Sequence, residues 1–227
     1  MTGARPTAGR PARRSLWRRG ATGAALLLAG VGLAGCWMYP AEWNEKLTVT
    51  IATPQGDVSG SAVRWQTLSE DPVLRSAHAR LGGEAVVVEV AKGRYLFALL
   101  QQYRPQTEIL FFPDEAPLES AYKLNSRKGE VLTVPREMYP MLVTFGNLSS
   151  PASVQQVDPA NLAATFGPGY ALKSITLEIT DEPVTKGWAN KLLPWLGPYP
   201  EPGLCKSTNE LEYPLCRQVT HGSFRRS

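Results

Sequence analysis

The sequence predicts a β-rich α+β fold, built from antiparallel hairpins with a few short helices. Two observations lead to this class. Short runs of alternating apolar and polar residues recur along the chain, and 19 Pro and 20 Gly in 227 residues argue against long helices. With 43% hydrophobic residues, the chain is long enough to bury one sizeable core. We therefore expect one compact domain and an irregular C-terminal extension.

The first hairpin is predicted by residues 46–53, which read KLTVTIAT and alternate at the period of a half-buried strand. Residues 54–57 read PQGD and supply turn chemistry. Residues 58–65 can then return as the second arm.

The clearest hairpin is predicted further along, between two apolar runs. Residues 85–90 are rich in Val, and residues 95–100 are apolar again after a Lys-Gly-Arg turn. Between the two hairpins, residues 68–83 break the β pattern. There Asp71 and Pro72 indicate the cap and first position of one short helical turn.

The second half predicts shorter elements. Asp158 and Gly167 are typical of a helix start and a helix stop. We expect strands at 108–112, 131–134, 141–145 and 171–180, and short helices at 158–167 and 185–193.

The N-terminal segment has the parts of an export signal. A basic stretch is followed by an uncharged run of residues 20–35 that ends in small residues. This run is shorter than the roughly 20 apolar residues that a transmembrane helix needs, and Gly and Ala dilute it. A cleaved signal is therefore favoured over a permanent membrane span.

The end of this segment resembles the lipobox of bacterial lipoprotein precursors. The residues that carry the resemblance are Leu33, Ala34, Gly35 and Cys36. In that family the cysteine thiol receives a diacylglyceryl group and becomes the first residue after cleavage. The resemblance implies a lipidated Cys36 and a protein held on the exported, periplasmic side of a bacterial membrane.

The cysteine count fits this interpretation. Of three cysteines, lipidation of Cys36 leaves Cys205 and Cys216 as an even pair. In an oxidising compartment we expect a structural disulfide between them, worth about 2 to 3 kcal/mol in the chain-entropy model. A metal pair or a redox dithiol would need further ligands or a Cys-x-x-Cys spacing.

The charge distribution argues against a nucleic-acid partner. The whole chain carries a formal charge of +4, but six arginines precede Cys36, and 18 basic residues face 20 acidic ones in the remainder. The mature part has only short basic pairs, such as Arg127-Lys128 and Arg225-Arg226. The expected partners are a membrane, through the lipid anchor, and an envelope protein or polymer.

The expected organisation has four parts. Residues 1–35 are the signal, 36–45 a short tether, 46–196 the β-rich domain, and 197–227 a Pro-rich extension stapled by the disulfide. The aromatic residues of the tether, Trp37, Tyr39 and Trp43, suit either a membrane interface or packing on the domain.

No familiar catalytic, metal or nucleotide motif appears in the sequence, and we expect no cofactor. A hydrolase would have to assemble serines or carboxylates by folding. The candidates are Ser59, Ser61, Asp114 and Asp181, and sequence alone places no base beside them.

Two phrases resemble an uncharacterised group of small exported bacterial proteins. The first comprises residues 46–56 with 58–63, and the second comprises residues 177–185 with 193–196. Both have the composition of β-strands and turns. The resemblance implies no activity. The leading hypothesis is a non-catalytic envelope lipoprotein that binds a partner or serves as a structural accessory. An envelope hydrolase and a ligand carrier remain alternatives.

Overall fold

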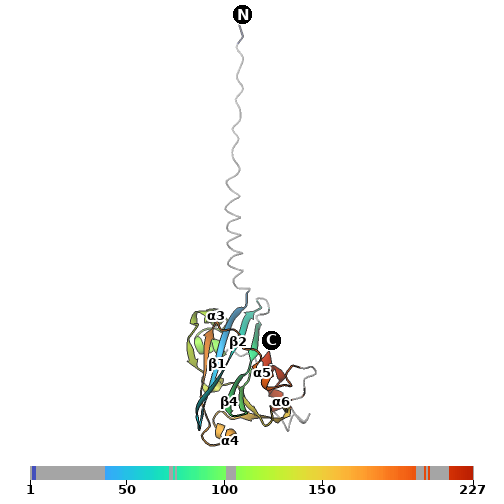
Figure 1. Ribbon diagram of the computed structural model, residues 1–227. Coiled ribbons are helices and arrows are strands. Elements are labelled where there is room, and N and C mark those ends of the chain that lie inside the picture. Colours follow the sequence, from blue (N-terminus) through green and yellow to red (C-terminus); the bar gives the residue numbers. More distant parts are fainter. Residues whose placement is uncertain are drawn as a thin grey trace. The chain divides into compact units, whose positions relative to one another are not determined.

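The computed structural model describes residues 2–3, 39–71, 74, 76–100, 106–197, 202, 204 and 215–226. The folded unit comprises Pro40–Ser227. It contains two antiparallel sheets and short helices, so the β-rich α+β class is confirmed (Figure 1). The expected signal over 1–35 lies outside the described residues except for two positions.

The strands fall into a six-stranded and a four-stranded sheet. In the first sheet the order is β10 (Arg225–Arg226), β3 (Ala77–Glu84), β2 (Gly56–Glu70), β1 (Ala41–Thr53), β9 (Ala171–Thr180) and β6 (Val131–Thr133). In the second it is β4 (Val86–Ala91), β5 (Arg94–Ala98), β7 (Leu142–Phe145) and β8 (Val154–Val157).

All helices of the described residues are short. The α-helices are α2 (Gln106–Phe111), α3 (Pro117–Lys123), α4 (Leu162–Phe166), α5 (Trp188–Leu192) and α6 (Leu215–Gln218). The 3-10 turns are η1 (Leu124–Arg127), η2 (Arg136–Met138), η3 (Pro151–Ser153) and η4 (His221–Ser223).

The β1–β2 hairpin confirms the alternation expected from sequence and extends it. Its register runs from Thr53 opposite Gly56 to Ala41 opposite Leu68. The strand therefore begins five residues before the expected start at residue 46, and residues 41–45 of the expected tether lie in β1. Trp43 is buried and packs on the domain.

The main core lies between the two sheets. Val49 and Ile51 of β1 and Ile175 of β9 are fully buried, and Val88 and Leu96 of the second sheet belong to the same apolar cluster. Such contiguous burial is what two sheets with apolar facing sides require. The core therefore carries one face of each sheet.

A second apolar cluster covers the other face of the four-stranded sheet. The ring of Phe97 makes edge contacts with Phe145 and Phe224, at centroid distances of 5.5 and 5.9 Å. Val219 and Phe224 are buried there. The expectation of an irregular extension over 197–227 is thus corrected, since its described residues complete this core and add β10. The apolar outer face of the second sheet needs such a cover.

Two sequence expectations are wrong. Residues 77–84 form β3 and β2 continues to Glu70, where a break in the β pattern over 68–83 was expected. Residues 108–112 were expected to be a strand, yet α2 covers Gln106–Phe111. A short apolar run cannot distinguish a strand from a buried helical turn by its periodicity.

Other expected elements are confirmed with shifted ends. These are the hairpin over 85–100, the strands near 131–134, 141–145 and 171–180, and the helices within 158–167 and 185–193. In α4 the cap is Asn161, whose side chain accepts a hydrogen bond from the Ala164 amide, rather than Asp158. Gly167 ends this helix at a φ of 107°.

A buried polar cluster joins β1, β2 and α2 beneath the sheet. The Glu45 carboxylate is 0% exposed. It forms an ion pair with Arg64 and accepts hydrogen bonds from the Thr107 hydroxyl and, at 3.2 Å, from the Trp43 indole. A buried charge is tolerated when it is paired and hydrogen-bonded in this way.

We expect Glu45→Gln to lower the free energy of unfolding by about 3 kcal/mol, because it leaves the Arg64 guanidinium without its counter-charge in a nearly dry environment. Urea unfolding of both proteins measures the change. The matched control is Glu42→Gln on the exposed face of the same strand, expected within about 0.5 kcal/mol of the wild type. Equal losses in the two variants would contradict the role given to Glu45.

Candidate binding site

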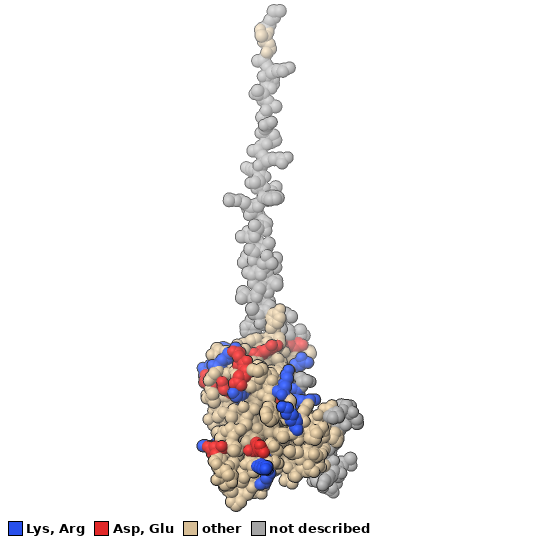
Figure 2. Space-filling view, viewed as in Figure 1, with Lys and Arg blue, Asp and Glu red and all other residues tan. Residues whose placement is uncertain are grey.

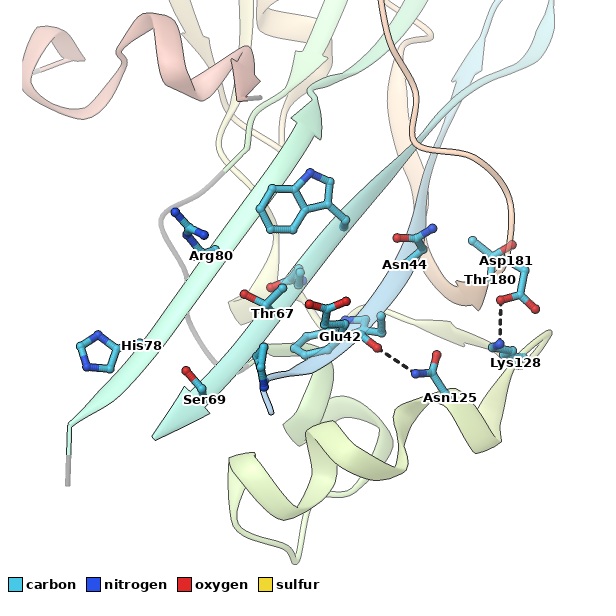
Figure 3. Close-up of a pocket in the computed structure, with 14 residues that line it drawn as sticks. Glu42, Asn44, Thr67, Ser69, His78, Arg80, Asn125, Lys128, Thr180 and Asp181 are labelled. Carbon is cyan, nitrogen blue, oxygen red and sulfur yellow. Dashed lines mark hydrogen bonds and ion pairs between the residues drawn. The ribbon is translucent and has the colours of Figure 1, made fainter. Parts of the chain in front are cut away.

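An open hollow of about 690 Å³ lies on the face of the six-stranded sheet that points away from the core (Figure 3). It forms at the end of the sheet where β1 begins, and Pro40 lines it. Because side chains alternate along a strand, the inward positions of Trp43 and Glu45 turn Glu42 and Asn44 outward toward the hollow.

Strand register assembles the floor of the hollow from three strands. Glu42 of β1 lies opposite Thr67 of β2, and Thr67 lies opposite Arg80 of β3. The next row places Asn44 opposite Trp65. Two adjacent rows on one face of the sheet thus bring together five kinds of group: an acid, a hydroxyl, a guanidinium, an amide and an indole.

Trp65 rests on a glycine of the neighbouring strand. Gly82 lies opposite it, and a Cβ added to Gly82 would come within 2.2 Å of the Trp65 indole nitrogen. The absence of a side chain therefore makes room for the indole. A glycine next to a large aromatic residue on a sheet often marks such a close approach.

The other wall of the hollow comes from the turn after α3 and the chain after β9. The Asn125 amide donates to the Glu42 carbonyl at 2.8 Å, and Lys128 pairs with Asp181 at 2.6 Å (Figure 3). The first contact joins this wall to β1, and the second joins it to the chain that follows β9. The Asp181 side chain is 77% exposed, so this pair adds little to stability.

A second ion pair fixes the segment after β9. Lys46 pairs with Glu182 at 2.6 Å, and the Asn44 amide donates to the Glu182 carbonyl at 3.2 Å. The hydrogen bond to Glu182 raises the pKa of Lys46 above its ordinary value, although burial acts in the opposite direction. The Lys46 ammonium therefore stays charged across the physiological pH range.

One hydroxyl–imidazole pair occurs at the edge of the hollow. The Ser76 hydroxyl lies 3.3 Å from Nε2 of His78, and His78 is exposed. Nucleophilic catalysis needs a base that is itself oriented by a third group. Among the hydrogen bonds and ion pairs of the described residues, no carboxylate contacts this imidazole. The arrangement resembles an ordinary surface hydrogen bond.

The structure separates the sequence candidates for hydrolysis. Ser59 and Ser61 are exposed on β2, where the Ser59 hydroxyl lies 2.9 Å from that of Thr50. Asp114 is exposed after α2. Asp181 alone lines the hollow, where Lys128 neutralises it.

The sequence candidates for covalent modification lie largely outside the described residues. This is true of Cys36 and Cys205, and for Cys216 only the backbone, in α6, is described. Within the described ranges, no group of three or more His, Cys, Asp or Glu could hold a metal ion. The helices found there include none that is long and apolar enough to span a membrane.

Comparison with protein-family models, with curated proteins and with solved structures gives no match for this chain. The site must therefore be interpreted from its own chemistry. Its floor combines polar and charged side chains with the Trp65 indole, and such a combination can hold a polar ligand.

We expect Gly82→Ala to destabilise the protein by about 1 to 3 kcal/mol, because the added methyl group must displace the Trp65 indole. Thermal unfolding monitored by circular dichroism measures this change. The control is Gly146→Ala, whose new Cβ would meet only the Ser153 Cβ, at 3.8 Å. It should stay within about 0.5 kcal/mol of the wild type. Unfolding of both variants at the wild-type temperature would contradict the requirement for a glycine beneath Trp65.

Proposed function

We propose that this chain is a lipid-anchored protein of the bacterial cell envelope whose folded unit binds a ligand and catalyses no reaction. The proposed anchor is Cys36, on the exported side of the membrane. Its support is the signal-like segment over 1–35 and the lipobox resemblance of residues 33–36. The proposed partner is an envelope protein or polymer.

The observation that carries this proposal is the short distance along the chain between Cys36 and the hollow. Pro40 lines the hollow and lies four residues after Cys36. Four residues span at most about 14 Å, even when fully extended. A lipid on Cys36 would therefore hold the rim of the hollow next to the membrane surface. Any ligand bound there would be captured at that surface.

The internal space supports surface binding over carriage of an apolar ligand. The cavity between β1 and α2, lined by Leu47 and Leu110, has a volume of only about 20 Å³. That volume accommodates one water molecule, whereas a drug-sized ligand needs several hundred Å³. The hollow on the outer face is large enough, but its floor is polar.

We also propose that Cys205 and Cys216 form a disulfide that closes the C-terminal segment. Support comes from the buried residues on either side, Leu204 and Val219, which belong to the same apolar cluster. Their shared cluster brings the two flanks of the segment toward one core. Closure of this short loop would favour the folded arrangement by restricting the unfolded chain.

Replacement of Cys36 by Ser tests the anchor. In a bacterial host the full chain should fractionate with membranes and carry the mass of an acylated mature protein. The Cys36→Ser variant should appear in the soluble fraction, with its signal uncut or aberrantly cut, because serine has no thiol to lipidate. Cys205→Ser serves as the control and should remain in the membrane fraction. The anchor is refuted by a Cys36→Ser protein of unchanged mass and unchanged membrane fractionation.

Alkylation tests the disulfide. In the exported protein, a thiol reagent added without reductant should leave Cys205 and Cys216 unmodified, and prior reduction should expose both. Peptide mass spectrometry reads the two sites separately. Ready labelling of both cysteines without reduction would show free thiols instead.

A further inference from the structure

Trp65 lines two further hollows besides the one described above. One has a volume of about 600 Å³ and is lined by Arg80, Leu81, Arg225 and Arg226 together with Trp65. The other has a volume of about 480 Å³ and lies along the same two C-terminal arginines. We call these two together the arginine hollow. The indole of Trp65 stands at their common border.

Backbone pairing brings the three arginines together from distant parts of the sequence. In β10, Arg226 lies opposite Gly83 and Arg225 lies opposite Glu84 of β3. Arg80 precedes these partners on the same strand. The Arg226 side chain donates to the Gly222 carbonyl at 2.9 Å, which steadies its stem. All three arginines line the hollow of about 600 Å³ at this edge of the six-stranded sheet.

These guanidinium groups have no acidic side chain as counter-ion within the described part of the chain. The ion pairs found there do not include Arg80, Arg225 or Arg226. Figure 2 shows basic side chains gathered in a band on the visible face of the folded unit. An uncompensated cluster of this kind raises the local positive potential and attracts anions.

Among the described residues that line the arginine hollow, the only acid is Glu84, and backbone amides bind its carboxylate. Glu84 is 3% exposed. Its carboxylate accepts hydrogen bonds from the amides of Gly187, Trp188 and Ala189 at 2.5, 2.8 and 3.1 Å. These bonds cap the start of α5 and occupy the carboxylate oxygens. Lys186 adds a further positive charge to the lining.

We propose that the arginine hollow binds a phosphate group and that Trp65 contacts the part of the molecule that carries it. Guanidinium groups present paired donors that match the oxygens of phosphate, and an indole offers a flat apolar surface beside them. This inference goes beyond the ligand binding proposed at the first hollow, with which the arginine hollow shares Trp65 and Arg80.

Two sources of phosphate are compatible with the chain. Arg80 lies two strands across from Glu42, which is six residues after Cys36. Its backbone is therefore within about 30 Å of Cys36 along extended chain and sheet. A phospholipid headgroup and a soluble phosphate ester are both available at that range from an anchored protein.

The test follows the indole N–H signal of Trp65 by nuclear magnetic resonance in the full chain, held in nonionic detergent. The chain has six tryptophans, and Trp65→Phe identifies the signal. The probes are inorganic phosphate, glycerol phosphate, micelles doped with phosphatidylglycerol, and micelles doped with a fatty acid. The last probe supplies negative charge without phosphate.

We expect a saturable shift of the Trp65 signal with at least one phosphate-bearing probe and none with the fatty acid. A response to the soluble probes identifies a phosphate ester as the source, and a response to phosphatidylglycerol alone identifies a headgroup. Arg225→Gln combined with Arg226→Gln should weaken binding at least about tenfold, because charge-assisted hydrogen bonds are lost. Arg80→Gln, which leaves β10 intact, should weaken it in the same direction.

The matched control is Lys92→Gln combined with Arg136→Gln, which removes two exposed positive charges from other parts of the surface. Its affinity should stay within about twofold of the wild type. No shift with any phosphate probe, an equal shift with the fatty acid, or an equal loss in the control would overturn the proposal. The fractionation of the Cys36→Ser variant tests the lipid anchor independently of this titration. Failure of the anchor and failure of phosphate binding are therefore distinguishable.

Discussion

The folded unit depends on the burial of the Glu45 carboxylate. Moving such a charge out of water costs several kcal/mol unless partners surround it, and here Arg64, Thr107 and the Trp43 indole do so. These partners come from two strands and a helix, so the same contacts fix the position of α2 on the sheet. Glu45 also belongs to the inward-facing set of β1, in which buried and outward-facing side chains alternate. Because of that alternation, Glu42 faces outward at the hollow.

A second buried carboxylate organises the opposite side of Trp65. Glu84 ends β3 and holds the first turn of α5 through three amide hydrogen bonds. The chain beyond α5 then covers the outer face of the four-stranded sheet, where Phe224 is fully buried. Because Phe224 is held there, Arg225 and Arg226 continue directly into β10 beside β3. The two carboxylates thus position the residues on either side of one indole.

Sequence patterns predicted the fold where a strand has one apolar and one polar face. They succeeded for β1 beyond residue 46. They also succeeded for the hairpin over 85–100, where continuous apolar runs predicted strands that are buried on both faces. They failed at residues 41–45, because a glutamate in a sequence normally indicates an exposed position. Only the structure shows that Arg64 pairs with Glu45 and allows its burial. They failed at β3 as well, because Ala77–Glu84 has few apolar residues and owes its strand conformation to pairing with β2. Tertiary contacts decide such segments.

The candidate site was harder to predict, because register rather than spacing assembles it. The net charge also failed to indicate where positive side chains share a surface. The part of the chain after Cys36 is slightly acidic, and Arg225-Arg226 alone is an unremarkable pair. Pairing of β10 with β3 brings Arg80 to that pair across 145 positions of sequence, while the nearby Glu84 is engaged by amides. Electrostatic attraction depends on the charges that share a surface and on the partners they already have. A part of the chain whose net charge is slightly negative can therefore still carry a local surface that attracts anions.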